Sequence, residues 1–447
     1  MGNGGMRDWP WVRAIVLALA LLISLPLPLF PRSPVATASL HDVTLVSTAT
    51  PEGRLAVFDD AWARINERYY DQTFHGLDWE AQRTIFRAQA AKAASAPDLY
   101  AVLRRMIASL NDPHTRVFAP EEKFEWWRPR FVTVGFAVAE VAGLPTVIKV
   151  DDKTEAGRAG VRAGDVIETV NGEPALGLVN SRLANLPDSS SSSARFRVFA
   201  KLLDGPANTT VDITWKGKDG KRKSARFERY WQQRELGVRV SRERGDYAVV
   251  SLDAFTKTIA TDFARTIRAK LNGSKGVIID LRSNGGGDAE AMSDIASSFL
   301  GIGVDLGQFT DRVGTSFTIY TQPRSLLTLF GLEQSKLPLV VLTSERTASA
   351  AEIFVEALRV SRRATIIGAQ TCGCVLAVRT RHLLPDGGLL DVSELDYETP
   401  SGAHLEGHGI EPDETIQPAR ADLYANRDRA MRMAILAIKD TAAKNGK

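Results

Sequence analysis

The second half of the chain alternates short apolar runs with longer amphipathic segments, and this alternation restricts the fold more than any other feature. Buried strands are predicted at residues 247–252, 277–281, 339–342 and 365–367. Helices are predicted between these runs at 288–300 and 349–361, where apolar residues recur at helical spacing. A last amphipathic helix is predicted at 419–439. Strands and helices in alternation indicate an α/β domain, in which helices cover a sheet.

Residues 55–128 predict a small helical module. Apolar side chains recur at helical spacing from Leu55, and a second helix is predicted at 79–94. A third helix begins near Pro97, because proline is favoured in the first turn, and it ends before residues 111–114.

Residues 129–230 have a different character, with short strands separated by turn residues. Strands are predicted at 147–150, 166–170 and 211–215, and a helix at 196–203. Asn171-Gly172 is a strong signal for a tight hairpin. The serine run at 189–193 predicts a flexible loop. Together these patterns indicate a separate, strand-rich domain.

The N-terminus carries an export signal. Two arginines precede an apolar run at 14–30, and a small-x-small sequence follows at 36–38. This order is typical of a cleaved secretory signal at residues 1–38, and an uncleaved membrane anchor is the alternative. Residues 39–54 are then a tether. With either reading the body is exported, to the periplasm or the cell envelope.

Composition excludes several classes of function. The chain has 56 basic and 53 acidic residues, without the concentrated basic patch of a nucleic-acid-binding protein. Its two cysteines, Cys372 and Cys374, exclude a disulfide scaffold, and a bond between residues two apart would be strained. They are expected to be two small, partly buried side chains. No ligands at metal-binding spacing are present, so neither a metal nor an organic cofactor is expected.

Two segments of the α/β region can carry chemistry. Gly285-Gly286-Gly287 follows a predicted strand, and such a run exposes backbone amides that can bind an oxyanion, or forms a flexible turn. Ser349 opens a predicted helix between small alanine neighbours. It is either a helix cap or a nucleophile that a substrate carbonyl can approach.

Five segments in this order resemble the tail-specific, or C-terminal-processing, serine peptidases and their relative, the tricorn core protease. The segments are Leu-Asn-Asp-Pro-His-Thr at 110–115, Ala-Gly-Val-Arg-Ala-Gly-Asp-Val-Ile at 159–167, the glycine run, Thr-Ala-Ser-Ala-Ala-Glu at 347–352 and the loop at 399–413. The resemblance implies a PDZ domain at 129–230 and a crotonase-like α/β spiral as catalytic domain at 231–447.

The resemblance also implies roles for single residues. Ser349 is the nucleophile, and the Ala350 amide forms an oxyanion hole with the amide of Gly286 or Gly287. A substrate C-terminus would bind by strand addition at the PDZ loop, which contains Val134, Gly135 and Phe136.

The general base of the family is missing from its usual place. Cys374 stands at the lysine position, Val378 at the position of its glutamine partner, and Val360 at that of a family aspartate. In the tricorn-like branch a histidine of the helical module serves as base, with an acidic residue of the late loop. His114 and Glu406 match those positions, and a histidine titrates in the range this role needs. A structural role for His114 is the alternative.

These observations predict an exported serine endopeptidase that cuts unfolded or tail-accessible proteins by acyl transfer from Ser349. Its partners would be polypeptides with accessible C-termini, and a homo-oligomer is compatible with the sequence. Because the family lysine is absent, the alternative is an inactive PDZ-bearing peptide-binding or adaptor protein.

Overall fold

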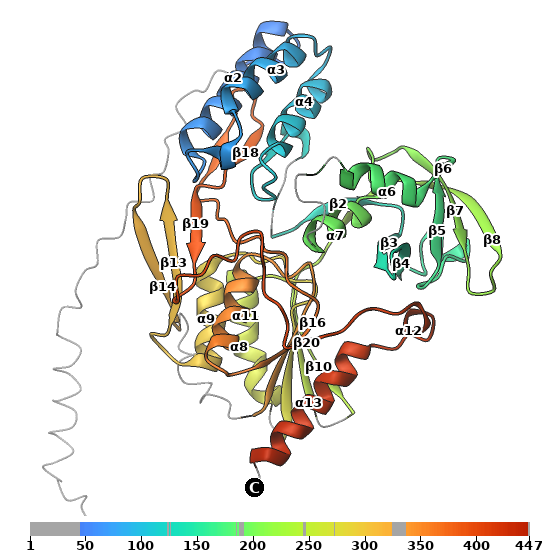
Figure 1. The fold of residues 1–447 in the computed structure, drawn as a ribbon, viewed down its shortest axis with the longest axis vertical. Coiled ribbons are helices and arrows are strands. Elements are labelled where there is room, and N and C mark those ends of the chain that lie inside the picture. Colours follow the sequence, from blue (N-terminus) through green and yellow to red (C-terminus); the bar gives the residue numbers. More distant parts are fainter. Residues whose placement is uncertain are drawn as a thin grey trace, which may run out of the picture. The chain divides into compact units, whose positions relative to one another are not determined.

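The computed structural model describes residues 45–445, except 123–124, 126, 185, 187–191, 245–246, 272 and 324–336. The predicted signal or anchor, and most of the serine run, lie outside these residues. The described part is a mixed α/β structure (Figure 1). None of its helices is long and apolar enough to cross a membrane.

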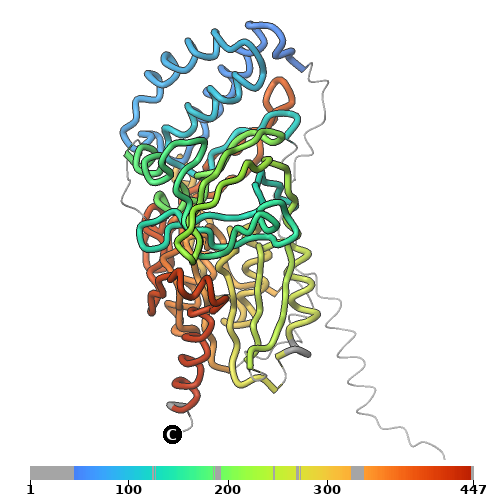
Figure 2. The backbone as a smooth tube through the Cα atoms, turned by 90° about the vertical axis from the view of Figure 1, so that its right-hand side faces the viewer, coloured from blue at the N-terminus to red at the C-terminus, as the bar shows by residue number. Residues whose placement is uncertain are grey.

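A six-stranded sheet forms the centre of the α/β region. Its strands in spatial order are β10 (Val238–Glu243), β11 (Tyr247–Leu252), β12 (Gly276–Asp280), β15 (Leu339–Thr343), β16 (Thr365–Gly368) and β20 (Glu414–Thr415). Within this sheet β11, β12, β15, β16 and β20 run parallel to one another, and β10 is antiparallel to β11. Figure 2 shows β10 and β11 side by side in the yellow part of the tube. The four predicted buried strands are confirmed as β11, β12, β15 and β16.

Helices cover both faces of this sheet. One face packs against α8 (Lys257–Leu271), α9 (Ala289–Leu300) and α11 (Ala350–Val360). The other face packs against α13 (Arg429–Asn445). Successive side chains of a strand point to opposite faces, so Ala248 and Val250 face the first layer while Tyr247 and Val249 face α13. Both faces are therefore dry, which explains the continuously apolar strands.

The prediction of a single C-terminal helix at 419–439 is wrong. The structure has a short helix α12 (Arg420–Tyr424) and then α13, separated by a turn in which Asn426 has a φ of 48°. The positive φ breaks the helical path, and asparagine tolerates it better than most residues. The tether prediction also ends too late, because α2 already begins at Pro51.

Three capped helices form the helical module. They are α2 (Pro51–Arg68), α3 (Trp79–Ala91) and α4 (Ala96–Ala108), and their N-caps are Thr50, Asp78 and Ser95. Each cap side chain accepts a hydrogen bond from a backbone amide of the first turn, as capping residues do. A short 3₁₀ turn at Phe74–Gly76 lies between α2 and α3, and another at Pro120–Glu122 comes after α4.

The core of this module includes a hairpin from a distant part of the chain. Strands β17 (Arg381–Leu383) and β18 (Leu389–Asp391) pair with β1 (Arg116–Phe118), and Figure 1 shows β18 beside α2. Leu384, Leu390 and Val392 are buried among the apolar side chains of α2 and α4. The sequence had placed these residues with the catalytic domain only.

Residues 130–233 form the strand-rich domain. Its sheet has the order β3 (Phe136–Val141), β4 (Leu144–Val150), β5 (Val166–Val170), β7 (Thr210–Lys216) and β8 (Arg222–Glu228), with β6 (Glu173–Pro174) beside β5. The Asn171-Gly172 hairpin is confirmed between β5 and β6, and both residues have positive φ. The helices are α5 (Glu155–Arg158), α6 (Ala175–Ala184) and α7 (Ser192–Ala200). The ribbon of β2 (Arg130–Thr133) and β9 (Tyr230–Gln233) connects this domain to the rest.

A smaller sheet of β14 (Ser316–Tyr320), β13 (Asp305–Asp311) and β19 (Leu395–Glu398) lies between the late loop and the helical layer. Tyr397 of β19 packs against Phe309 of β13 and donates a hydrogen bond to the Leu306 carbonyl. The sequence analysis did not predict these strands. They carry the chain towards the loop at 399–413.

The distant hairpin is expected to stabilise the helical module. Replacing Leu390 by alanine removes a fully buried side chain from that core, so the free energy of unfolding should fall by about 2–5 kcal/mol. Urea denaturation of the exported chain measures this loss. Leu383→Ala in the same hairpin is the control, because Leu383 is 45% exposed. Equal stability of the two variants would contradict the shared core.

Candidate active site

Ser349 lies at a sharp turn between β15 and α11. Its φ of 57° and ψ of −128° are unusual for a residue with a side chain. The Ser349 amide donates to the carbonyl of Cys374 at 2.8 Å and to Glu352 Oε2 at 3.1 Å. The turn that carries the hydroxyl is thus held from two sides, and it places Ser349 one residue before the first turn of α11.

The glycine run reaches this turn. A Cβ at Gly286 would lie 2.7 Å from the Cβ of Ser349 and 3.1 Å from the Ala350 nitrogen, and Gly286 has a φ of 94°. Only glycine permits both the conformation and the close approach. The sequence prediction that this run and Ser349 belong to one site therefore has a geometric basis.

The amides proposed for an oxyanion hole differ in whether they already have a hydrogen-bond acceptor. The Gly286 amide donates to Asn284 Oδ1 at 2.8 Å. Ala350 occupies the first helical position, where an amide has no partner within the helix. No described residue accepts a hydrogen bond from the amide of Ala350 or of Gly287. These two amides, and not that of Gly286, are available to a developing oxyanion.

A buried glutamate organises the surroundings of Ser349. Glu352 is fully buried one turn into α11, and its carboxylate accepts four hydrogen bonds. The donors are the Ser349 amide, the Thr371 hydroxyl at 2.5 Å, the Gly373 amide at 2.7 Å and the Cys374 amide at 2.9 Å. Burial raises the pKa of Glu352, and the hydrogen bonds oppose this shift. Sequence reasoning missed this role, because the partners lie about 20 residues away.

The two cysteines form a disulfide, which corrects the expectation of two separate side chains. Their Cα atoms lie 5.2 Å apart, within the usual range for a disulfide. A sulfur bonded in this way carries no proton, so Cys374 does not replace the lysine as a base. The segment acts through its backbone instead, because the Cys374 carbonyl binds the Ser349 amide and the Cys372 amide donates to Thr347 at 2.9 Å.

Glu406 lies against the same segment. Its Oε2 accepts hydrogen bonds from the Val375 amide at 2.6 Å and the Leu376 amide at 3.1 Å. Burial raises the pKa of Glu406 to about 8, and the negative charges of Asp112 and Glu352 add to this rise. Ser349 and Glu406 therefore contact neighbouring residues of one segment. Ser349 binds Cys374, and Glu406 binds Val375 and Leu376.

His114 stands apart from these groups. Its Nδ1 is buried without a hydrogen-bond partner among the described residues and lies 4.0 Å from Asp112 Oδ1. No hydrogen bond joins the imidazole to Ser349 or Glu406 in the described part of the chain. Burial lowers the pKa of His114, while the charge of Asp112 opposes this effect. The lowered pKa favours the neutral imidazole, which is the form a general base requires.

Asp112 fixes the loop that carries His114. Its carboxylate accepts from the amides of His114 at 2.7 Å and Thr115 at 3.2 Å, and from the Thr115 hydroxyl. That hydroxyl in turn accepts from the Ser393 amide at 3.1 Å. Sequence reasoning did not assign Asp112 a role. Aspartate followed by proline is a turn signal from which this bonding pattern could have been predicted.

The predicted peptide-binding loop begins an edge strand. Gly135 has a φ of 91°, and a Cβ there would lie 2.5 Å from Thr154 Oγ1. The side chains of Val134 and Phe136 are buried in the domain core. Strand β3 has one neighbour, β4, among the described strands, and α7 packs beside it.

Two segments of the chain match known protein families. Residues 246–416 match peptidase family S41, and residues 51–108 match the tricorn protease C1 domain. The α/β region is similar to peptidase family S41, and the chain is a serine-type peptidase. The family match includes Ser349, the glycine run and Glu406. The comparisons give no support to the inactive adaptor.

The curated relatives of this peptidase are named processing peptidases or proteases. It is 28% identical over 434 residues to the Arabidopsis thaliana carboxyl-terminal-processing peptidase 3, chloroplastic, covering 90% of this chain and 76% of the relative. Among solved structures, the photosystem II D1 C-terminal processing protease has a TM-score of 0.52 at 24% identity, covering 83% of this chain and 96% of its own. Mature CPAF has a TM-score of 0.66 at 13% identity, covering 87% and 98%. The two structures share the fold.

Among the described residues no group of three or more histidine, cysteine, aspartate or glutamate side chains is placed to hold a metal ion. The chemistry available at the site is that of a hydroxyl, backbone amides, a neutral imidazole and buried carboxyl groups.

Removing the Glu352 carboxylate should destabilise the region around Ser349. Glu352→Ala leaves the Thr371 hydroxyl and the amides of Gly373 and Cys374 without an acceptor, and the free energy of unfolding should fall by about 3–5 kcal/mol. Urea denaturation measures the loss. Glu411→Ala is the control, since Glu411 is exposed and near the same loop. A loss below about 1 kcal/mol would contradict the central role of Glu352.

The raised pKa of Glu406 predicts a pH dependence of stability. Between its usual pKa of 4.5 and about 8, the folded chain binds more protons at this group than the unfolded chain. Stability should therefore fall as the pH rises through this window. Comparing thermal unfolding of the parent and Glu406→Gln between pH 5 and pH 8.5 isolates this contribution. Identical pH dependence in both proteins would show that Glu406 is ionised in the folded state.

Proposed function

We propose that this peptidase is an endopeptidase that cleaves unfolded or tail-accessible proteins by acyl transfer from Ser349. The observation that carries the proposal is the turn at Ser349, where the side chain lies against Gly286 and beside the Ala350 amide, which has no partner among the described residues. Relatives that cover most of this chain are named carboxyl-terminal-processing peptidases. Their names support the same kind of reaction here.

The acyl-transfer step needs a base. The Ser349 oxygen attacks the scissile carbonyl, and the amides of Ala350 and Gly287 stabilise the negative charge that forms on its oxygen. His114 takes the proton from the hydroxyl and returns it to the leaving amine, and a water molecule then hydrolyses the acyl-enzyme. Two observations support His114: its pKa is lowered, and its Nδ1 has no partner among the described residues.

This mechanism requires the His114 loop to approach Ser349. The structure is then a resting arrangement, and contact between the two side chains forms when substrate binds. Glu406 supports the base in the closed arrangement, because it already lies at the segment beside Ser349. Its charge state would then limit activity below pH 8.

The strand-rich domain is proposed to be a PDZ domain, and the catalytic domain a crotonase-like spiral. An open edge at β3 with α7 beside it supports strand addition by a substrate tail. Main-chain hydrogen bonds to β3 would hold the tail, and amides near Gly135 would receive its carboxylate. The N-terminal signal pattern supports action outside the cytoplasm, in the periplasm or at the cell envelope.

Ser349→Ala and His114→Gln test the catalytic pair. With an unstructured protein as substrate, Ser349→Ala should lower kcat at least about 10³-fold, and His114→Gln about 10²–10⁴-fold. His408→Gln is the matched control, because His408 is exposed on the loop that carries Glu406. Rates are measured by gel and by mass spectrometry of the products. A His114→Gln rate close to that of the parent would remove this residue from the mechanism.

A further inference from the structure

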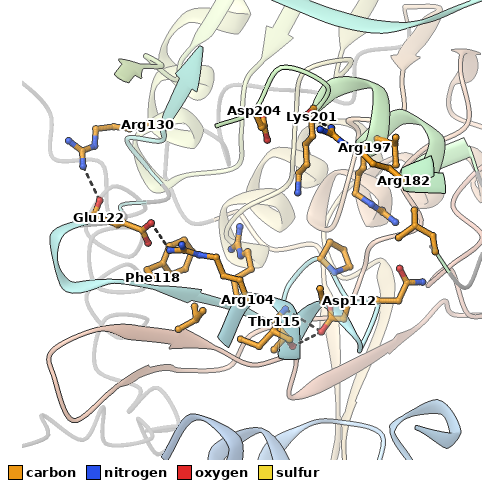
Figure 3. Close-up of a pocket in the computed structure, with 18 of the residues that line it drawn as sticks. Arg104, Asp112, Thr115, Phe118, Glu122, Arg130, Arg182, Arg197, Lys201 and Asp204 are labelled. Atoms are coloured by element: carbon orange, nitrogen blue, oxygen red, sulfur yellow. Dashed lines mark hydrogen bonds and ion pairs between the residues drawn. The ribbon is translucent and has the colours of Figure 1, made fainter. Parts of the chain in front are cut away.

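A cavity of about 840 Å³ lies between the helical module and the strand-rich domain (Figure 3). One wall is formed by residues of α4, β1 and the loop between them. The opposite wall is formed by α6 and α7. Seven basic and four acidic side chains line the cavity, so its lining carries a positive excess. Neither Ser349 nor the β3 edge residues Gly135 and Phe136 belong to the lining.

Three of the seven basic side chains lie on the wall formed by α6 and α7 and the residue after α7. On the opposite wall, Arg104 binds Glu122 at 2.6 Å and Arg116 lies 3.4 Å from Asp391. The α6–α7 wall carries Arg182, Arg197 and Lys201. Figure 3 shows Arg197 and Lys201 extending into the cavity, across from Asp112 and Thr115.

The hydrogen bonds of Arg182 and Arg197 go to groups that carry no charge. Arg182 donates to the backbone carbonyl of Lys201 at 2.8 Å, and Arg197 to the Ser193 hydroxyl at 3.2 Å. Both acceptors are neutral. No ion pair within 4 Å involves Arg182, Arg197 or Lys201 in the described part of the chain. Asp204 lies nearby, but burial raises its pKa and weakens it as a counter-charge.

Partial burial of Arg197 favours the binding of an anion at this wall. Desolvation lowers the pKa of Arg197, and the charge of Glu406 opposes this effect only in part. A concave site with low-dielectric walls also concentrates the field of its charges. Because Arg197 is already partly desolvated in the folded chain, its pairing with a carboxylate of a ligand costs less additional desolvation than pairing with a fully hydrated cation.

We propose that this cavity is an exosite that binds an acidic stretch of the polypeptide substrate through Arg182, Arg197 and Lys201. The inference rests on the proposed function and adds a substrate class to it. The exosite is separate from the β3 edge, and its opposite wall contains Asp112, Pro113 and Thr115. A bound acidic stretch therefore lies beside the loop that carries His114.

Binding can be measured without turnover. The exported chain with Ser349→Ala is titrated into a fluorescent unstructured peptide that contains four aspartates, and into a matched peptide with four asparagines. We expect the acidic peptide to bind at least about tenfold more tightly at low salt, with a smaller difference at higher ionic strength. Equal affinity for the two peptides would overturn the proposal.

Charge variants locate the site. Lys201→Gln and Arg182→Gln should each weaken binding of the acidic peptide several-fold, and Lys201→Glu should remove the preference. Lys201 and Arg182 are exposed, so the fold should tolerate these changes. Arg265→Gln is the control, because it removes a similarly exposed positive charge on α8, away from the cavity. Equal losses in all four variants would indicate a general charge effect and overturn the exosite.

The outcomes separate this proposal from the catalytic one. Preference for acidic peptides in the Ser349→Ala chain, without cleavage by the parent, would retain the exosite and contradict the endopeptidase. If the parent cleaves unstructured proteins but shows no preference for acidic peptides, the endopeptidase is retained and the exosite is contradicted.

Discussion

The active-site region depends on one buried carboxylate, that of Glu352. A charged or protonated carboxyl group without solvent is costly unless hydrogen bonds replace the lost water. Here four donors from two separate segments replace it: the Ser349 amide and the donors of Thr371, Gly373 and Cys374. The cost of burial is offset only when both segments are in place. The unusual backbone of Ser349 is thus maintained by its surroundings and not by its own preference.

The same network continues into the late loop. The Thr371 hydroxyl that donates to Glu352 also accepts from the Ile410 amide at 2.7 Å, and the Gly407 amide donates to Gly373 at 2.8 Å. Glu406 holds the amides that follow the disulfide. Residues 371–376 are therefore held through backbone contacts to Glu352, Glu406 and the late loop.

Local signals were enough to predict much of the fold. The buried strands β11, β12, β15 and β16 are apolar throughout because both faces of the sheet are covered, and helices α9 and α11 have clear apolar spacing. The predictions failed where the decisive contact is distant in sequence. The hairpin of β17 and β18 joins the helical core, and the strand pattern alone does not say which core buries Leu390. The break before α13 depends on a single residue, Asn426.

For the site, the residue types were predictable and their bonding was not. Gly286 lies against Ser349, and Glu406 binds the segment next to the one that holds the Ser349 amide, which fits the site that the family resemblance implied. The disulfide and the role of Glu352 depend on the approach of residues 371–376 to α11, which no local pattern encodes. His114 has a lowered pKa but lies outside hydrogen-bond reach of Ser349 in this arrangement.

The central claim is that the turn at Ser349, held by Glu352, makes this hydroxyl reactive. Its most direct measurement is intact-mass analysis of the exported chain after reaction with a fluorophosphonate, which labels activated serines. The account predicts one adduct, located at Ser349 by peptide mapping, that forms much more slowly in Glu352→Gln. An unlabelled Ser349 in the parent, or labelling at the same rate in Glu352→Gln, would contradict it.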